Sequence, residues 1–565
     1  MCDSVAVAAR RAPLFLWLLC ATVADPSIVS IPGLGSVRGV LNPLAREFRA
    51  LPYAAPPARF AAPTAPLPWN GVRDATVDGP GCYQSCTEPA GVCPTSVSED
   101  CLLLNIFTPL DANASSLLPV IVFFHGGAFR DGFGGGTLYN GTFLATGARD
   151  PAIVVSVSYR LGAFGFLFGS GAEPPAPDDP TGNFGILDQR AALTWVRANV
   201  AAFGGDAQRV TIWGQSAGAM SVATHLISPG SAGLYSSAVL DSEPFALPFR
   251  SVDSARALAA AVSVAASCDA ATQNTQSPAA CLRALSADAL LAASTVAAHN
   301  ITADLPFSLL SIFVPFTPTT GTPDVPNTPL LSFQGAPGAA RVADVPISVT
   351  TVKDEGTIFI YEGFGTPMSD IEYAALLAVA FGVGDGVRIG LQYPAPAGAS
   401  DVRNLTANVT TAALFRCASR NGTRSLAATP GRTAPVYLGE WVRLLSWAPA
   451  LWTNATPAYK ACWTKVCHAS ELPYLFFPQL EGRTAWTNDE ADLSAAGRAY
   501  LAAFAASSGI SMGDGAGNGA TPLAWPHLDA SADATPRMIL DAPSRRLEYE
   551  DDACALWDQL GYTFY

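Results

Sequence analysis

Short apolar runs alternate with stretches of helical spacing along most of the chain. Runs of strand type cover residues 120–124, 153–159, 210–213, 237–240 and 345–352, and their length and bounding turns favour buried strands. Residues 188–203 instead show helical spacing, and the alanine-rich residues 250–305 predict further helices, inserted on top of the sheet. Strands that alternate with helices indicate a parallel or mixed sheet with helices on both faces. The pattern therefore predicts the α/β fold class.

Glycine and proline interrupt this pattern at many places. The chain holds 49 Gly and 45 Pro without a regular period, which indicates many turns rather than a collagen-like or disordered chain. The two stretches richest in them, 170–181 and 316–337, are predicted surface loops. No internal repeat divides the 565 residues. We therefore expect one large domain over residues 25–565, because α/β folds accommodate a large sheet with many insertions.

The N-terminus has the pattern of a signal peptide. Arg10 and Arg11 precede an apolar run over residues 12–20, which is followed by small residues ending at Ala24. The run is short for a bilayer, which takes about 20 residues. We expect residues 1–24 to be a signal peptide and the protein to be secreted, the alternative being an uncleaved anchor. No other stretch is long and apolar enough to be a transmembrane helix.

The cysteines and glycosylation sequons agree with export. Of 12 Cys, two lie in the predicted signal peptide, and an even number of ten in an exported chain indicates five disulfides. A metal site is not expected, because the cysteine spacings match no zinc cluster and the chain has only five His,. Seven sequons make this an expected glycoprotein: Asn113, Asn140, Asn300, Asn404, Asn408, Asn421 and Asn454,.

The chain is acidic and sparsely charged. Charged residues make up 14% and the formal net charge is −14, whereas an average soluble protein has roughly 25% charged residues. A negative field repels phosphate backbones and acidic membrane surfaces, so nucleic acid is not an expected partner. Polar uncharged side chains and glycans are the remaining means of keeping such a surface soluble.

One short motif points to nucleophilic catalysis. Gly214-Gln215-Ser216-Ala217-Gly218 follows a predicted strand and precedes a predicted helix. A sharp strand–turn–helix needs small residues around the nucleophile, holds the serine hydroxyl clear of the sheet, and aims the next amide at the substrate oxygen. The motif alone is weak, and its alternative is an ordinary glycine-rich loop. Its position between strand and helix favours a nucleophile elbow at Ser216.

A second glycine-rich turn is a candidate oxyanion hole. His125-Gly126-Gly127-Ala128 directly follows the apolar run 120–124. A carbonyl under attack becomes an oxyanion, and each donor already in place lowers the barrier by roughly 3–4 kcal/mol. Backbone amides of such a turn can serve as donors. The alternative is a plain turn.

Further segments match the motifs of a known protein family in the same chain order. They are Leu51-Pro52-Tyr53 with Pro56-Pro57 and Arg59-Phe60, residues 98–105 (SEDCLLLN), Gly182-Asn183-Phe184-Gly185 with Asp188-Gln189-Arg190, Phe203-Gly204-Gly205-Asp206, the elbow at Ser216, Lys353-Asp354-Glu355-Gly356, and His468 before Glu471-Leu472-Pro473-Tyr474. With these motifs the chain resembles the type-B carboxylesterase and cholinesterase family of α/β-hydrolases over nearly its whole mature length. The resemblance implies a large, mostly parallel twisted sheet with helices on both faces and helical and loop insertions.

The resemblance also implies a catalytic triad of Ser216, Glu355 and His468. The order Ser, acid, His is the one expected of α/β-hydrolases. His468 would take the proton of Ser216, and Glu355 would hold the imidazole in the required tautomer. Asp354 is the immediate rival for the acid, and only the family register favours Glu355. No metal or cofactor is implied.

The same register implies the oxyanion donors and three of the disulfides. The donors would be the amides of Gly127, Ala128 and Ala217. The implied disulfides are Cys82–Cys101, Cys268–Cys281 and Cys417–Cys554. The two remaining pairs, Cys86 with Cys93 and Cys462 with Cys467, are our own inference, since both closures are short and local.

Three departures from the family bear on the substrate. The loop over residues 83–100 has no Trp, where cholinesterases hold the choline cation. Gln215 replaces a common Glu, which removes a negative charge beside the nucleophile. Glu243 replaces a usual Gly, and we expect its longer side chain to intrude on the acyl pocket. We therefore expect a secreted serine esterase acting on small-molecule carboxylic esters. The alternatives are a catalytically silent adhesion or scaffold protein of the same family and a lipase acting on longer acyl chains.

Overall fold

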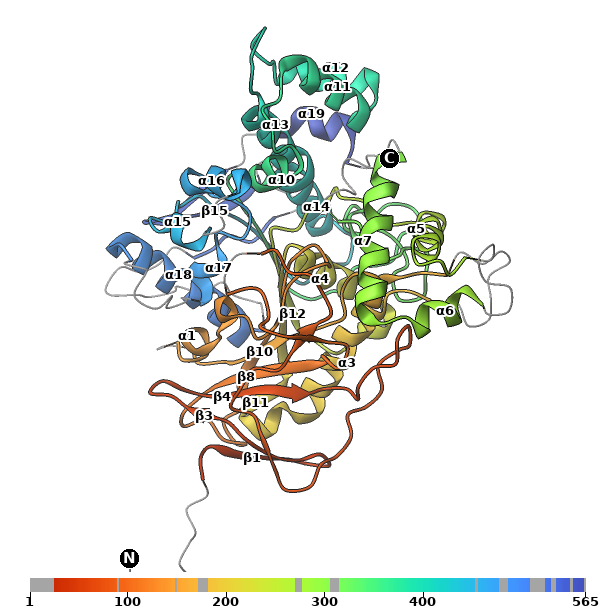
Figure 1. Ribbon diagram of the computed structural model, residues 1–565. Coiled ribbons are helices and arrows are strands. Elements are labelled where there is room, and N and C mark those ends of the chain that lie inside the picture. The colour runs from red at the N-terminus through yellow and green to blue at the C-terminus, as the bar shows by residue number, and fades with distance from the viewer. Residues whose placement is uncertain are drawn as a thin grey trace, which may run out of the picture.

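The computed structural model describes residues 25–88, 91–147, 150–170, 181–269, 277–304, 314–452, 456–476, 486–508, 524–529, 535–548 and 552–562. Within these ranges the largest sheet has eleven strands (Figure 1). In spatial order they are β16 (Arg545–Glu548), β15 (Pro536–Leu540), β14 (Val436–Trp441), β13 (Ile347–Val352), β12 (Ser237–Asp241), β11 (Gly205–Gln215), β9 (Leu118–Phe124), β10 (Ile153–Val157), β8 (Leu103–Pro109), β4 (Ala45–Pro52) and β3 (Val40–Leu41).

The middle of this sheet is parallel and its two edges are antiparallel. Every pair of neighbours from β10 through β9, β11, β12, β13 and β14 to β15 is parallel. The outer strands β16, β8, β4 and β3 pair in antiparallel fashion. The remaining described strands form two small sheets, β1 (Ile28–Ile31), β2 (Gly35–Arg38) and β5 (Val72–Asp74), and β6 (Gly81–Cys82) with β7 (Val97–Ser98). The predicted α/β class with a mixed, mostly parallel sheet is confirmed.

The predicted strands and the first predicted helix are present with shifted ends. The five apolar runs correspond to β9, β10, β11, β12 and β13. The stretch over residues 188–203 becomes α3 (Phe184–Asn199) and a following turn of 3₁₀ helix. The alanine-rich stretch contains α5 (Val252–Ala265), α6 (Pro278–Ala284) and α7 (Ala287–Asp304), which lie together at one flank of the molecule (Figure 1).

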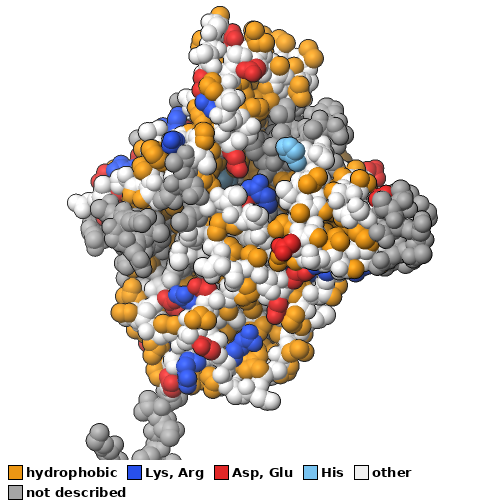
Figure 2. Space-filling view, in the orientation of Figure 1, with side chains coloured by type: hydrophobic (Ala, Val, Ile, Leu, Met, Phe, Trp, Pro, Cys, Tyr) orange, Lys and Arg blue, Asp and Glu red, His pale blue; other side chains and the backbone are white. Residues whose placement is uncertain are grey.

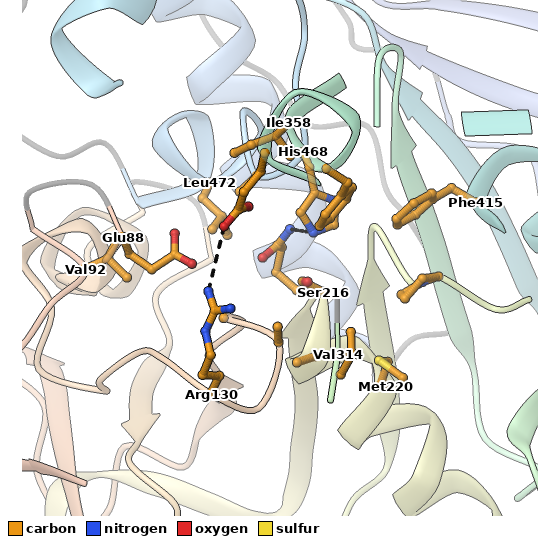
Figure 3. Close-up of a pocket in the computed structure, with 18 of the residues that line it drawn as sticks. Glu88, Val92, Arg130, Ser216, Met220, Val314, Ile358, Phe415, His468 and Leu472 are labelled. Atoms are coloured by element: carbon orange, nitrogen blue, oxygen red, sulfur yellow. Dashed lines mark hydrogen bonds and ion pairs between the residues drawn. The ribbon is translucent and has the colours of Figure 1, made fainter. Parts of the chain in front are cut away.

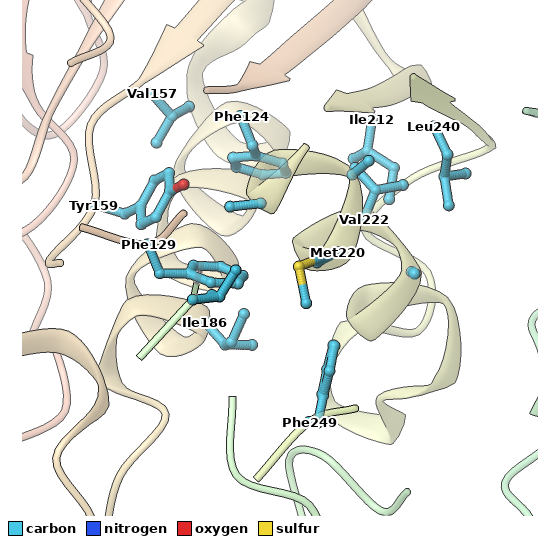
Figure 4. Close-up of a cluster of buried hydrophobic side chains, with 14 of the residues drawn as sticks. Phe124, Phe129, Val157, Tyr159, Ile186, Ile212, Met220, Val222, Leu240 and Phe249 are labelled. Atoms are coloured by element: carbon cyan, nitrogen blue, oxygen red, sulfur yellow. The ribbon is translucent and has the colours of Figure 1, made fainter. Parts of the chain in front are cut away.

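Each central strand contributes to two hydrophobic cores, because successive side chains point to opposite faces of a sheet. On one face Val122, Phe124 and Ile212 pack with α3 and α4 (Ala217–Ile227), and Figure 4 shows part of this cluster. On the other face Ile121, Phe123 and Trp213 pack with α1 (Thr142–Ala145), α17 (Leu472–Phe476) and α18 (Asn488–Ala506). Strands buried on both sides explain why the sequence shows continuous apolar runs rather than alternation.

The remaining helices are short or project from the sheet. They include α2 (Gly162–Phe166), α9 (Pro329–Phe333), α10 (Gly356–Gly363), α14 (Cys417–Ala427), α15 (Ala448–Leu451) and α16 (Pro457–Ala461). Another group, α11 (Asp370–Phe381), α12 (Val383–Gln392), α13 (Arg403–Thr410) and α19 (Asp552–Leu560), extends away from the sheet at the top of Figure 1.

The interpretation of residues 316–337 as a surface loop is wrong. Phe316, Val325, Leu330 and Phe333 are buried, and part of the stretch forms α9. High proline and glycine content marks turns, but it does not show whether the apolar residues between the turns are packed inside. Most of the other predicted loop, residues 171–180, lies outside the described residues, as do residues 1–24 with the predicted signal peptide.

Disulfides tie several of these elements together. All five expected pairs are present in the structure: Cys82–Cys101, Cys86–Cys93, Cys268–Cys281, Cys417–Cys554 and Cys462–Cys467. Among the residues that the structure describes, no helix has the length and apolar character needed to cross a membrane.

Candidate active site

The expected catalytic groups follow the carboxyl ends of parallel strands. The turn 125–128 follows β9, Ser216 follows β11, and Glu355 follows β13 shortly after its last residue. Because the carboxyl ends of parallel strands meet at one edge of a sheet, these segments lie close together there. His468 arrives separately, from the segment between α16 and α17.

Ser216 occupies a strained turn. Its backbone has φ 58° and ψ −124°, a region that residues other than glycine rarely adopt. A Cβ atom at Gly214 would lie 2.1 Å from the carbonyl oxygen of Gly218, and one at Gly218 would lie 1.9 Å from that of Phe124. Both glycines are therefore required by close backbone approach, which is the geometry expected of a nucleophile elbow.

Glu355 and His468 form a buried pair. The Nδ1 atom of His468 lies 2.5 Å from Oε2 of Glu355. The other carboxylate oxygen of Glu355 accepts a hydrogen bond from the backbone N–H of Val352 at 2.8 Å. The imidazole ring packs against Phe359 and Phe415, with ring centres 4.9 and 5.4 Å away. The carboxylate and the two aromatic rings together hold the imidazole in one orientation.

Asp354, the rival carboxylate, holds the backbone that carries His468. Its Oδ2 atom accepts a hydrogen bond from the N–H of Val466 at 3.0 Å, and its own N–H donates to the carbonyl of Val466 at 3.0 Å. Its side chain also lies 3.7 Å from the ammonium of Lys465. The structure thus sets Glu355, and not Asp354, against the imidazole.

Two other histidines near the sheet are structural. His125 stacks on Tyr159, and its Nδ1 lies 2.8 Å from the carbonyl of Gly126. His225 lies against Ser231 and Gln189. Burial lowers the pKa of His125 to about 4 and the pKa of His225 to about 3,. Both rings are therefore neutral near pH 7, and neither forms an ion pair or hydrogen bond with a carboxylate of the described residues.

The expected oxyanion donors line the same cavity as Ser216. Gly127, Ala128 and Ala217 are all part of its wall. Gly127 has φ 102° and Ala128 has φ 55°. With this backbone the turn does not continue the hydrogen-bond ladder of the strand before it, which leaves its amides available. Among the described residues, no hydrogen bond uses the amide of any of the three. Three unengaged donors beside a serine hydroxyl are suited to binding an oxyanion.

The cavity has a volume of about 260 Å³ and mainly apolar walls (Figure 3). Aliphatic and aromatic side chains such as Met220, Leu472 and Phe415 line it, and Ser216 and His468 face it. Figure 3 shows charged groups at one side, Glu88, which points inward, and Arg130.

This charged side was not identified from the sequence. Arg130 lies 2.9 Å from Asp131 and 4.0 Å from Glu362. Burial, followed by the negative charges of Asp131 and Glu362, raises the pKa of Glu88 to about 7,. The sequence does place Glu88 within the short Cys86–Cys93 loop and Arg130 just beyond the oxyanion turn. It does not show that these groups lie near Glu362, because the three come from segments far apart in the chain.

The structure also locates two of the departures from the family. Glu243 is buried, and burial raises its pKa well above the usual range. It is not among the described residues that line the cavity, although Pro244 is, so the expectation that Glu243 intrudes on the pocket is wrong. Gln215 contacts His468, with 3.2 Å between its Nε2 and the Nε2 of the imidazole.

The sequons differ in exposure. Asn113, Asn300, Asn404 and Asn408 are exposed, whereas Asn140 and Asn421 are partly buried. Asn454 lies outside the described residues.

Comparisons with known proteins identify the family and the fold. Residues 25–557 match the sequence profile of the carboxylesterase family. The Crystal protein of Dictyostelium discoideum is 31% identical over 536 residues, which cover 94% of this chain and 90% of that protein. The cocaine esterase of Homo sapiens is 40% identical over 259 residues, or 44% of each chain. A thermophilic PNB esterase structure has a TM-score of 0.75 at 27% identity and covers 94% of this chain and 100% of that chain. The expected α/β-hydrolase fold is thereby confirmed.

Proposed function

The chain belongs to the carboxylesterase family, and from this premise we propose that it is a serine esterase that cleaves carboxylic esters through an acyl-enzyme intermediate on Ser216. The observation that carries the proposal is the buried pair of His468 and Glu355 facing the cavity that holds Ser216. A base oriented by a carboxylate beside a serine on a strained turn is the arrangement that activates a hydroxyl for attack.

The reaction proceeds in two halves. The oxygen of Ser216 bonds to the ester carbonyl carbon while its proton moves to Nε2 of His468. The carbonyl oxygen becomes an oxyanion that accepts hydrogen bonds from the amides of Gly127, Ala128 and Ala217. When the carbon–alcohol bond breaks, Nε2 returns the proton to the leaving alcohol. Water then attacks the acyl group by the same route and restores Ser216.

The cavity supports a small-molecule ester as the substrate. Apolar and aromatic side chains make up most of its wall, so they would bind the hydrocarbon parts of an ester, and the few polar groups would fix its orientation. The chemistry uses protein groups alone and takes no metal or cofactor.

The proposal includes a secreted, glycosylated protein with one catalytic domain over residues 25–565. Five disulfides support an oxidising compartment,. The signal-like segment over residues 1–24 and the seven sequons support the same route,.

The decisive experiment replaces the nucleophile. Ser216→Ala should lower turnover of p-nitrophenyl acetate by a factor on the order of 10⁶ and abolish labelling by a fluorophosphonate, with the melting temperature nearly unchanged. The wild-type protein should be labelled once per chain. Turnover by the folded variant within tenfold of wild type would refute the assignment of Ser216, and an unlabelled, inactive wild type would favour the silent scaffold. A series of p-nitrophenyl esters of increasing acyl length then separates an esterase from a lipase.

A further inference from the structure

The side chain of Gln215 is packed between two parts of the candidate active site. Gln215 is the last residue of β11 and is 3% exposed. On one side its Nε2 atom lies 3.2 Å from Nε2 of His468. On the other side a Cβ atom at Gly126 would lie 2.7 Å from Oε1 of Gln215. Gln215 therefore touches both the oxyanion turn and the base, and Gly126 is needed to leave it room.

The tautomer of His468 decides what this contact does. Nδ1 lies 2.5 Å from the carboxylate of Glu355, which can only accept hydrogen bonds when ionised, so Nδ1 carries the ring proton. Nε2 of the neutral ring then holds a lone pair, and the amide nitrogen of Gln215 donates to it. Within the described part of the chain, the hydroxyl of Ser216 makes no hydrogen bond to His468.

The reaction requires the same lone pair. A general base accepts the serine proton at Nε2, and an imidazolium has donors on both nitrogens. The amide N–H of Gln215 opposes an N–H once Nε2 is protonated. The contact thus stabilises the neutral ring and must break when the proton is transferred.

We propose that Gln215 is a positioning residue that occupies the Nε2 lone pair of His468 in the resting enzyme and yields it to Ser216 when an ester fills the cavity. The proposal rests on the proposed function. It makes the resting hydroxyl of Ser216 less reactive than in an enzyme where the base is already hydrogen-bonded to the serine.

The charges around His468 make the contact with Gln215 sensitive to the identity of residue 215. Glu355 contacts the ring directly, and the buried carboxyl groups of Asp241 and Glu471 lie beyond it. Burial, followed by neighbouring carboxylates, raises the pKa of Glu471 well above its usual range, and burial raises that of Asp241 to about 6. On the cavity side the charged groups are Glu88, Arg130 and Glu362. The amide of Gln215 adds no charge to this set, whereas a carboxylate there would favour the imidazolium.

Two substitutions give different expected results. Gln215→Met keeps the shape but has no donor, so a fluorophosphonate should label Ser216 about fivefold faster than in wild type, since a net neutral hydrogen bond contributes about 1 kcal/mol at most sites. Gln215→Glu should move the acid limb of kcat/KM for a neutral ester upward by about one pH unit, because an opposite charge within hydrogen-bond distance favours the protonated imidazole.

Gln189→Glu is the matched control. Gln189 is also buried, and its Oε1 lies 3.1 Å from Nε2 of His225, outside the cavity. This variant should leave the acid limb and the labelling rate unchanged, whatever it does to the melting temperature. Labelling of Gln215→Met at or below the wild-type rate, together with an unmoved acid limb in Gln215→Glu, overturns the proposal. If Gln215→Met does not fold, the acid limb of Gln215→Glu alone decides. An unlabelled wild type, by contrast, would refute the proposed function itself.

Discussion

At the scale of single residues, the contact of His468 with Glu355 separates two adjacent carboxylates. Glu355→Gln should lower kcat/KM for p-nitrophenyl acetate by up to ~10⁴, because the amide fails to hold the imidazole in the required tautomer. Asp354→Asn should lower kcat/KM far less, since the side-chain oxygen of the asparagine can still accept the hydrogen bond from the N–H of Val466. The two variants serve as controls for each other, and the reverse ranking would mean that Asp354 is the acid.

Glu88 predicts a pH-dependent preference among substrates. Its pKa of about 7 means that the carboxyl group is mostly neutral at pH 6 and mostly ionised at pH 8. The cavity therefore gains negative charge as pH rises through 7. Between pH 6 and pH 8, the binding free energy of an ester with a distal ammonium group should become more favourable by about 1 kcal/mol relative to a neutral isostere. Its KM relative to that of the isostere should therefore fall roughly fivefold.

The matching variants test which group titrates. Glu88→Gln should abolish the pH-dependent part of this preference. Glu362→Gln should keep it but move its midpoint to lower pH, because the negative charge of Glu362 helps to raise the pKa of Glu88. A preference that survives Glu88→Gln unchanged would assign the effect to another group.

At the scale of elements, the loop closed by Cys462–Cys467 predicts a local effect on catalysis. The general base follows Cys467 directly, and about 1 Å of misplacement can cost ~10²-fold in rate. Cys462→Ser with Cys467→Ser should therefore lower turnover much more than it lowers the melting temperature. The chain-entropy term for a loop of 5 positions is only roughly 2 kcal/mol.

The long-range disulfide provides the comparison. Cys417–Cys554 spans 137 positions, for which the same term is roughly 5 kcal/mol. Cys417→Ser with Cys554→Ser should lower the melting temperature more and the turnover of the folded fraction less. If the two double variants behave alike, the Cys462–Cys467 loop has no special positioning role.

Strands and turns that are marked by a local sequence pattern could be predicted from the sequence. Contacts between elements that are distant in the sequence could not. The apolar runs and the glycines around Ser216 mark a strand and its turn, because tight turns impose local residue choices. The pairing of Glu355 with His468 came from the family register alone. Glu88, Arg130 and Glu362 meet only through tertiary folding, and the contact of Gln215 with His468 joins positions 253 apart. The error at residues 316–337 arose because composition does not report burial.

At the scale of the whole molecule, few charges cover a large surface. Figure 2 shows charged side chains scattered among apolar and uncharged groups on the viewed face, in keeping with a charged fraction of 14%. Glycans at exposed sequons would supply the missing polarity. Each replacement of Asn113, Asn300, Asn404 or Asn408 with Gln should remove one glycan, so the protein should migrate faster on a gel by one step. The replacements should also lower the yield of secreted protein.

Asn421 is the control among the sequons. Its Nδ2 donates to Asp558 at 3.1 Å and its Oδ1 accepts from Gln334 at 2.9 Å. Because a glycan at this nitrogen would displace the bond to Asp558, Asn421→Gln should leave the gel mobility unchanged. A mobility step lost at Asn421 but at none of the exposed sites would contradict the role assigned to exposure.

The late position of His468 in the chain has a consequence for biosynthesis. Glu355 and His468 are 113 positions apart, and contacts across such separations form late, because loop-closure entropy opposes them until the intervening strands are in place. A chain still being synthesised carries its nucleophile well before it carries its base. Under the proposed function the chain cannot hydrolyse esters until His468 has been made and has reached Glu355. Recovery of esterase activity during refolding should therefore report when this long-range contact forms.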